Sequence, residues 1–325
     1  MPAPTAILLL PAAARLGGVA LTDATVARAL GRADRLPAAA AGEQPQLLRH
    51  FELLPRGWPV AALTRTLDAD DAPLSAWLRA DPAYVRPDIN GARLLACGEA
   101  LRLERHDVAE LLPALRPLFG DAGFPLDAPD PHRWYLRLPR GARLPTFVPP
   151  ADALGADLLD VPGAGGGDGP EGRRWRALLS EAQVVLHNHP RNAARIASGR
   201  PPVNSLWFWG AGIVPDHIRT RAGTVASRDI LLRALGTAAG ARVGDVPEAF
   251  VVPGADAPEG GTLFDLRDRR DPARLERDWL APAVDAIGDG AIGRLVADLE
   301  DGTRLALSHG QRWRIWRQPL RALAP

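Results

Sequence analysis

The sequence predicts an α/β protein, and three observations lead to this class. Residues 6–10 form a continuous apolar run that a proline ends, which is typical of a buried parallel strand. A helical pattern that closes at Gly31 follows this run. Towards the other end of the chain, the apolar run 249–252 precedes a helical pattern over 272–287. Strands that alternate with helices favour a sheet with helices on its faces.

The middle of the chain changes character from about Asp81 onward. A helix over 108–118 lies between two short strand-like runs. These runs are residues 93–96 and 134–138. This order predicts a small inserted α+β subdomain, together with a return helix, over residues 82–199. Residues 1–81 and 200–325 are then expected to form one α/β core.

The composition fits a folded globular protein and excludes several kinds of chemistry. Hydrophobic residues make up 46% of the 325 residues and charged residues 24%. All 39 basic residues are arginines, which excludes a Schiff-base lysine and a phosphate-loop lysine. The single Cys97 excludes an internal disulfide and a multi-cysteine metal site.

Charge and hydropathy also restrict the partners that we expect. The net charge of +1 provides no general attraction to nucleic acid, so we do not expect nucleic acid as a partner. No apolar run approaches the roughly twenty residues that span a bilayer. The first residues lack the basic start of a signal peptide. We therefore expect a cytoplasmic protein without a membrane span.

A polar cluster lies between the end of a helix near His187 and a short aromatic strand at 206–209, which is expected to belong to the core. Arginine guanidinium groups suit phosphates and carboxylates because they donate paired hydrogen bonds. The segment therefore predicts a polar pocket for an anionic small molecule. The candidate ligand-binding residues are His189, Arg191, Asn192, Arg195 and Asn204. The alternative interpretation is a solvated loop whose polar side chains cap helices.

The same segment resembles part of a known family. The motif consists of His189-Pro190-Arg191-Asn192, then Arg195, Gly199, Pro202, Asn204 and Gly210-Ala211-Gly212. It resembles the segment by which archaeal-type cofactor-independent phosphoglycerate mutases return from an inserted domain to their catalytic core. Those enzymes belong to the alkaline phosphatase superfamily, so the resemblance implies an alkaline-phosphatase-like core sheet. The form NSLWFWGAG is similar to a bacterial branch called regulators of pathogenicity factors, type E.

The resemblance also implies a metal centre, whose ligand motifs this sequence does not match. In the mutases the first strand ends in a metal-binding Asp-Gly pair, whereas residues 11–13 here are Pro-Ala-Ala. After a hairpin expected over 294–308, Ser308-His309-Gly310 keeps only the histidine of the family's Asp-His-Ser motif. No serine lies in a motif that matches the family's nucleophile.

Two-metal catalysis requires a complete set of ligands. We therefore expect a phosphoglycerate-mutase-like protein with no cofactor and no catalytic residue, which acts as a binding or regulatory protein with an unknown partner. Whether it retains enzyme activity stays open at this point.

Two other functions remain as alternatives. A divergent metal-dependent phosphomutase would bind Mn, Zn or Mg through displaced ligands. Those ligands would come from Asp68, Asp70, Asp265, Asp268 and His309. A nucleic-acid-binding regulator would use the basic and aromatic run at 312–321, which also suits a membrane surface. For this run we favour packing of Trp313 and Trp316 on the core.

Overall fold

The structure is a computed structural model, which describes residues 3–88, 91–139, 141–161, 169–254 and 260–323. The chain forms two compact units. The core unit comprises residues 1–56 and 216–325, and the inserted unit comprises residues 57–215. Each unit has its own sheet and its own hydrophobic core. Within the described ranges, no helix combines the length and apolar character needed to cross a membrane.

The core unit is built on a seven-stranded sheet in the order β11-β10-β12-β1-β13-β14-β2. Its central strand β1 (Thr5–Leu10) runs parallel to both neighbours, β12 (Thr262–Asp265) and β13 (Arg294–Leu299). The remaining strands are β2 (Asp34–Arg35), β10 (Thr224–Ala226), β11 (Arg242–Gly244) and β14 (Arg304–Ser308). β14 is antiparallel to β13, and β2 is antiparallel to β14. The predicted α/β class with a core sheet is confirmed.

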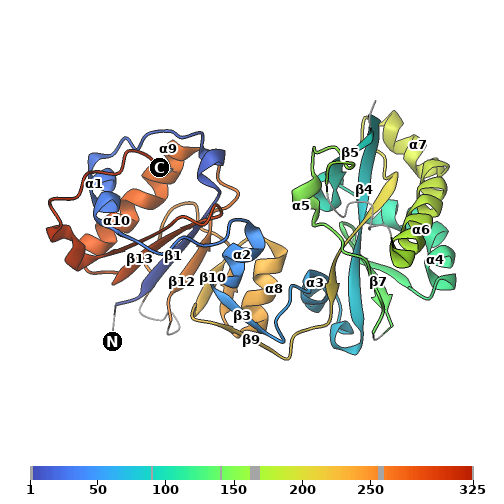
Figure 1. The fold of residues 1–325 in the computed structure, drawn as a ribbon, viewed down its shortest axis with the longest axis horizontal. Coiled ribbons are helices and arrows are strands. Elements are labelled where there is room, and N and C mark those ends of the chain that lie inside the picture. Colours follow the sequence, from blue (N-terminus) through green and yellow to red (C-terminus); the bar gives the residue numbers. More distant parts are fainter. Residues whose placement is uncertain (1–2, 89–90, 140, 162–168, 255–259, 324–325) are drawn as a thin grey trace. The chain divides into compact units, whose positions relative to one another are not determined.

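Helices pack on both faces of this sheet because β1 is apolar on both faces. Leu8 and Leu10 share one core with Val26 and Trp279. The helices on this face are α1 (Ala24–Arg32), α9 (Pro272–Leu275), the π-helix η4 (Glu276–Leu280) and α10 (Ala281–Gly288). In Figure 1 they lie to one side of the strands, away from α2 (Glu43–Leu48) and α8 (Ile230–Ala238). Smaller elements of this unit are η1 (Ala13–Leu16), η5 (His309–Trp313) and the two-stranded sheet of β3 (Phe51–Leu54) and β9 (His217–Thr220).

The prediction of one strand in the core unit is wrong. Residues 249–252 contain no strand; the strand in this part of the chain is β12 (Thr262–Asp265), which the polar residues at both ends concealed. Phe250 packs against Phe264 and Trp279, while Val251 and Val252 are exposed. A short apolar run can therefore look like a buried strand in the sequence even when only one of its side chains is buried. The expected hairpin, in contrast, is present as β13 and β14, with Gly302 in the left-handed region.

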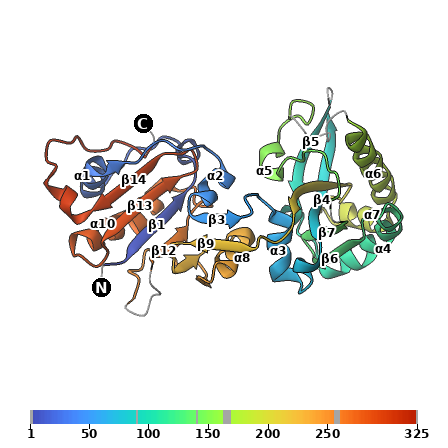
Figure 2. The ribbon, with the colours of Figure 1, turned by 60° about the horizontal axis from the view of Figure 1, so that its bottom comes forward.

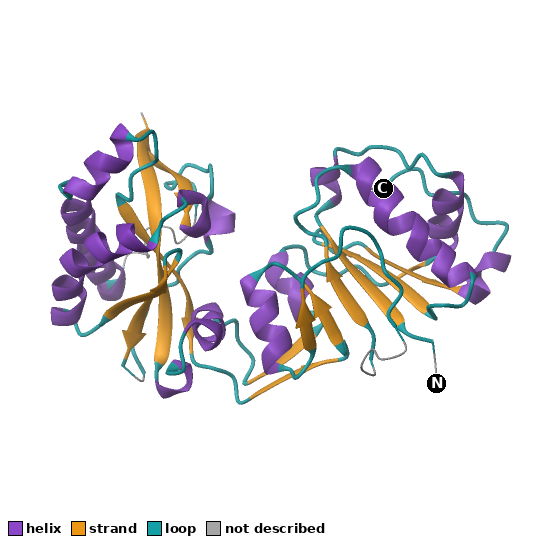
Figure 3. Cartoon of the chain, turned by 180° about the vertical axis from the view of Figure 1, so that it is seen from behind, coloured by secondary structure: helices purple, strands orange, loops and turns teal. Residues whose placement is uncertain are grey.

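The inserted unit contains an antiparallel sheet organised by the long strand β4 (Ala76–Asp88). β4 pairs with β5 (Gly91–Cys97), β7 (Arg133–Leu138) and β8 (Ser205–Gly212), and β6 (Leu126–Asp130) pairs with β7. The longer helices are α4 (Arg105–Asp121) and α6 (Pro170–His187). The others are α3 (Val60–Asp68), η2 (Ala72–Leu74), η3 (Gly98–Leu101), α5 (Pro150–Ala153) and α7 (Pro190–Ala197). Figure 3 shows the sheet in orange with its helices in purple.

The partner of β8 differs from the expectation. Residues 206–209 were expected in the core sheet, but Trp207 pairs with Asp81 and Phe208 with Ala80, so β8 lies in the sheet of the inserted unit. The two units divide near residues 56 and 215, whereas the expected division lay near 81 and 200. β8 is buried on both faces: Phe208 packs in one hydrophobic cluster and Trp207 in another. A strand buried on both faces has the same apolar pattern whether it is parallel or antiparallel.

Candidate functional site at the carboxyl edge of the core sheet

The residues predicted to form an anion pocket lie in the inserted unit, where they hold α7 and the strand that follows it. His189 caps α7, with its Nδ1 accepting a hydrogen bond from the backbone N–H of Arg191. Asn192 is buried and donates to the carbonyls of Leu186 and Val203 at 2.6 and 2.7 Å. Asn204 instead exchanges two hydrogen bonds with the backbone of Val85 on β4.

The two arginines of this predicted pocket converge on one buried carboxylate. Arg191 Nε donates to Asp107 Oδ1 at 2.6 Å, and Arg195 Nη1 donates to Asp107 Oδ2 at 2.8 Å. Arg195 also donates to the carbonyls of Leu101 and Pro201. These contacts fasten α7 to α4 and to the end of η3. The guanidinium groups are thus engaged within the chain, and anion binding at this cluster stays a prediction.

The candidate metal ligands are divided between the two units. Asp68 and Asp70 belong to the inserted unit, where Asp68 accepts hydrogen bonds from Arg133 and Tyr135. His309 follows β14, whose last residue Ser308 pairs with Arg294 at the start of β13. His309 therefore lies at the edge of the core sheet opposite to Asp265, which ends β12. Across the described part of the chain, no three His, Cys, Asp or Glu side chains form a group that could hold a metal ion.

A different pair of carboxylates marks the carboxyl edge of the core sheet. Leu9 of β1 is in register with Asp265 of β12 on one side and with Asp298 of β13 on the other. Residues paired in this way point to the same face, and adjacent strands are about 4.8 Å apart, so the two aspartates lie roughly 10 Å apart across Leu9. In open α/β sheets, the ends of the parallel strands are where ligands bind. We call this edge the carboxyl-edge site.

Helix α2 covers the Asp298 side of the carboxyl-edge site. The buried Gln46 donates through its Nε2 to the carbonyls of Leu10 and Asp298 at 3.0 and 2.7 Å. Arg49 Nε and Nη2 form a bidentate pair with the Asp298 carboxylate at 3.0 and 2.6 Å, and His50 Nε2 lies 2.8 Å from its Oδ2. Burial raises the pKa of Asp298, but the hydrogen bonds and charges of His50 and Arg49 outweigh this and the pKa is lowered overall. The carboxylate is therefore ionised at neutral pH.

The Asp265 side is organised in the same way around Arg267. Arg267 Nε and Nη2 bind the two oxygens of Asp265 at 2.7 and 2.9 Å, and the Ser227 hydroxyl donates to Oδ2 at 2.7 Å. Arg267 Nη1 also reaches Glu43 of α2 at 2.8 Å, and Asp229 lies 3.7 Å away. One guanidinium is thus surrounded by three carboxylates.

The pKa values around Arg267 follow from this arrangement. Burial acts to raise the pKa of Asp265, but hydrogen bonding and charge from Arg267 lower it overall. The pKa of Glu43 is raised because its burial outweighs the attraction of Arg267. For Arg267, burial is opposed by Asp265 and the other carboxylates, which raise its pKa overall. The guanidinium therefore stays charged at neutral pH.

The carboxylate oxygens of this site are engaged by donors from the chain itself. Both oxygens of Asp265 and both oxygens of Asp298 already accept hydrogen bonds from charged or hydroxyl donors. An arginine supplies positive charge and N–H donors, but it offers no coordination site that could lower the pKa of a water molecule. Ser227, the hydroxyl nearest to these carboxylates, is fully buried and donates its proton to Asp265. It is not placed to act as a nucleophile.

Sequence reasoning identified Asp265 but missed Asp298, Arg267 and Arg49. An acidic residue inside the apolar run of β13 was a signal that could have revealed Asp298, because a buried carboxylate needs a partner. Its partners were not readable from the sequence, since Arg49 lies far from Asp298 along the chain. The placement of α2 against the end of β13 decides these pairs.

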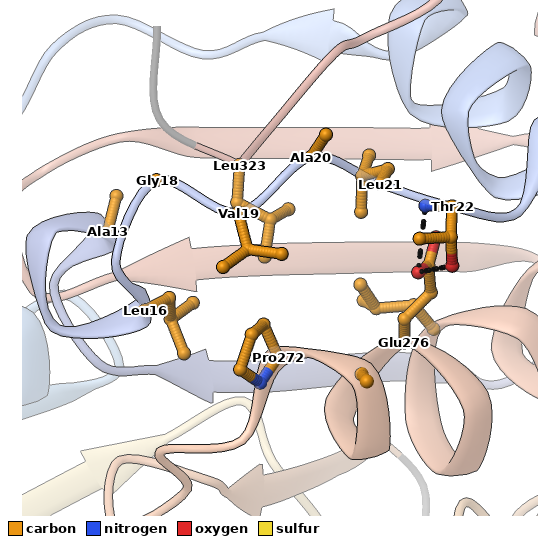
Figure 4. A pocket seen from close by; sticks show the side chains of 12 residues that line it. Ala13, Leu16, Gly18, Val19, Ala20, Leu21, Thr22, Pro272, Glu276 and Leu323 are labelled. Atoms are coloured by element: carbon orange, nitrogen blue, oxygen red, sulfur yellow. Dashed lines mark hydrogen bonds between the residues drawn. The ribbon is translucent and has the colours of Figure 1, made fainter.

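A separate cavity in the core unit has a structural role. It is a cavity of about 40 Å³ between the loop after η1 and the start of α9, lined mainly by apolar side chains such as Leu16, Leu21 and Pro272. Figure 4 shows Glu276 reaching across to Thr22. This carboxylate accepts hydrogen bonds from the Thr22 N–H and hydroxyl and from the Asp23 N–H. Its acceptors are therefore used to fix the chain before α1.

Comparison with known proteins yields a partial match, and no family model matches the chain. Over 137 residues, 40% of the chain, it is 32% identical to a probable 2,3-bisphosphoglycerate-independent phosphoglycerate mutase of Geobacter sulfurreducens, of which the match covers 33%. It is 35% identical over 108 residues to the corresponding mutase of Methanosarcina barkeri, covering 26% of that protein. The matches thus span about a quarter to a third of these relatives' lengths.

Among solved structures, the cofactor-independent phosphoglycerate mutase from Thermoplasma acidophilum aligns with 95% of this chain and 90% of its own. The TM-score is 0.44 and the sequence identity is 18%. Over about two fifths of its length, the chain is therefore similar in sequence to cofactor-independent phosphoglycerate mutases.

Proposed function

We propose that this chain is a phosphoglycerate-mutase-like protein that carries arginines where a two-metal phosphotransferase needs divalent cations. In this proposal it has an alkaline-phosphatase-like core, belongs with the type E regulators of pathogenicity factors, and works as a non-catalytic binding or regulatory protein. The observation that carries the proposal is the pair of carboxylates at the carboxyl-edge site, Asp265 and Asp298, each held by a bidentate arginine.

The chemical argument rests on what two-metal catalysis requires. Two cations stabilise both the attacking and the leaving oxygen of a transferred phosphoryl group, and they need free carboxylate or imidazole donors. At the carboxyl-edge site the donors are already bound to Arg267, Arg49 and His50. Arginines could still bind a phosphate group, but binding substrate and transition state equally does not accelerate the chemical step.

The direct test is metal content and turnover of the purified protein. The full chain is incubated with Mn, Mg, Zn or Co, desalted, and analysed for bound metal and for interconversion of phosphoglycerates. We expect neither stoichiometric metal nor turnover above background. Stoichiometric metal together with metal-dependent turnover would contradict the proposal and establish the phosphomutase alternative.

A variant tests whether Arg267 takes the place of a metal ion. Arg267→Gln removes the guanidinium from among Asp265, Glu43 and Asp229 and leaves three carboxylates facing one another. Their mutual repulsion is relieved by a cation, so we expect tighter Mn²⁺ binding than in the unmodified protein. The control is Arg228→Gln, an exposed arginine next in the chain to Ser227. If both variants bind Mn²⁺ as the unmodified protein does, the guanidinium does not stand in for a metal.

A further inference from the structure

The C-terminal segment carries three exposed large apolar side chains within four residues. The exposed fractions are 68% for Trp313, 77% for Ile315 and 73% for Trp316. The expectation that Trp313 and Trp316 pack on the core is therefore wrong. We call these three residues the apolar tip; they lie on η5 and the turn that follows it. A single exposed apolar residue is ordinary, but a contiguous group indicates an interaction surface.

The backbone beneath the apolar tip is held in place. Ser308 and Gln311 form a capping box at the start of η5, and Gln311 also donates to Asp34. Arg314, between the two tryptophans, forms a 2.5 Å ion pair with the same Asp34 and donates to the carbonyl of Arg32. The chain thus presents the tip from a fixed turn on the edge of the core unit. Ordering the tip for binding costs little additional entropy.

A basic cavity adjoins the apolar tip. Its volume is about 420 Å³, and Arg28, Arg32, His309 and Arg312 line it together with apolar residues of α10. Asp285 and Asp289 also line it. Figure 2 shows α1, which carries Arg28 and Arg32, beside β14, which leads into η5.

The arginines of the basic cavity keep their charges available. Arg28 donates to Thr25, Arg32 donates to the carbonyl of Arg312, and the Arg312 guanidinium lies 4.8 Å over the ring of Trp313. Within the ranges that the structure describes, none of these three forms an ion pair with a carboxylate; in this they differ from Arg314. Unpaired guanidinium groups beside exposed tryptophans favour a partner that is both anionic and apolar.

We propose that this surface docks the core unit on an anionic phospholipid bilayer. Trp313, Ile315 and Trp316 enter the boundary between headgroups and acyl chains, where tryptophan is favoured because its ring is apolar and its N–H is polar. Arg28, Arg32 and Arg312 meet the lipid phosphates at the same level. The binding is peripheral, and the apolar tip and the basic residues act together, as in surface-bound amphipathic segments.

The composition of the surface favours lipid over nucleic acid. Ile315 is the most exposed of the three side chains, and it can neither stack on a base nor form a hydrogen bond. One face of Trp313 is already covered by Arg312, which leaves less ring for stacking. The local basic cluster supplies the attraction that an anionic bilayer surface needs.

The test is sedimentation of the full chain with large vesicles. One set consists of phosphatidylcholine alone, and the other of phosphatidylcholine mixed with anionic phosphatidylglycerol. We expect binding to the mixed vesicles only, and weaker binding as salt increases. Trp313→Ser combined with Trp316→Ser should reduce the partition coefficient at least about tenfold, since burial of a large apolar side chain is lost. Arg28→Gln and Arg32→Gln should each reduce it about fivefold.

Matched controls and alternative partners complete the experiment. Leu74→Ser removes an equally exposed apolar residue from the inserted unit, and Arg228→Gln removes an exposed charge elsewhere in the core unit; neither should change vesicle binding. The proposal is overturned if the mixed vesicles do not bind, or if the tryptophan and control variants bind alike. It is also overturned if a single-stranded oligonucleotide binds more tightly than vesicles, or if the protein forms dimers without lipid that Trp313→Ser dissociates.

Discussion

Two arginines of the inserted unit show how burial decides the role of a single side chain. Arg195 and its partner Asp107 are fully buried, and the Arg195 guanidinium also satisfies two backbone carbonyls. Arg200, five residues later, pairs with Glu104 in a position where both side chains are about half exposed. A buried pair that loses one member leaves an uncompensated charge, whereas solvent screens an exposed pair.

At the residue scale we therefore predict a large difference between two alanine substitutions. Arg195→Ala should lower the free energy of unfolding by about 3–5 kcal/mol, because the Asp107 carboxylate stays buried with a weaker set of partners. Arg200→Ala, the matched control, should cost less than about 1 kcal/mol. Urea unfolding followed by circular dichroism measures both values. Equal and small losses, together with weakened anion binding in Arg195→Ala, would instead favour a ligand-binding role for Arg195.

At the scale of elements, the short helix α2 determines what the carboxyl-edge site can do. It is too short to be stable alone, so its position depends on tertiary contacts. It supplies Glu43 to Arg267 and inserts Gln46 between the ends of β1 and β13. Arg49 and His50 follow directly and bind Asp298. This helix and the two residues after it thus bind the ends of β1 and β13 directly, and they reach the end of β12 through Arg267.

Substitution of Gln46 tests this role of α2. Gln46→Leu removes the donor to the carbonyls of Leu10 and Asp298 and replaces the glutamine by an apolar side chain of similar volume. We expect a loss of about 1–3 kcal/mol, because buried carbonyls lose a partner. Gln44→Leu is the matched control: Gln44 lies on the same helix but is exposed, and its substitution should be nearly neutral. Thermal unfolding compares the two variants, and equal midpoints would show that Gln46 does not hold α2 in place.

At the scale of the whole molecule, each unit has a large hydrophobic core among its described residues, and these two cores share no residue. The core unit is assembled from two distant segments around Leu8, Phe264 and Trp279. The inserted unit is one continuous segment around Trp134, Trp175 and Phe208. A continuous segment that contains every strand of its own sheet satisfies its backbone hydrogen bonds within itself.

Two fragments test where the inserted unit begins and ends. Fragment 57–215 should fold alone, with a cooperative thermal transition and an ordered near-ultraviolet signal from its buried tryptophans. Fragment 82–199, bounded as the sequence analysis expected, lacks α3, β8 and the first half of β4. It should remain unfolded, because β7 loses its pairing with β4 and Phe208 no longer fills the core. A folded fragment 82–199 would contradict the observed boundaries.

The sequence by itself determined the elements whose signals are local. The apolar run of β1, the helix α4, the hairpin of β13 and β14, and the existence of β8 all follow from residue patterns within a few positions. Such patterns are readable because helix and strand place apolar side chains at fixed spacings. They also sufficed to predict an α/β protein, while the resemblance to the mutases rests on the separate motif at residues 189–212.

Only the tertiary structure decided which elements and side chains meet. The apolar pattern of β8 shows that the strand is buried, but not that β4 is its partner. The exposure of Trp313 and Trp316 is equally invisible in the sequence, since apolar residues are found on surfaces as well as in cores. Asp298 meets Arg49 across 249 residues of chain, because strand register and the placement of α2 determine that contact. The chemistry of the carboxyl-edge site depends on this long-range pairing.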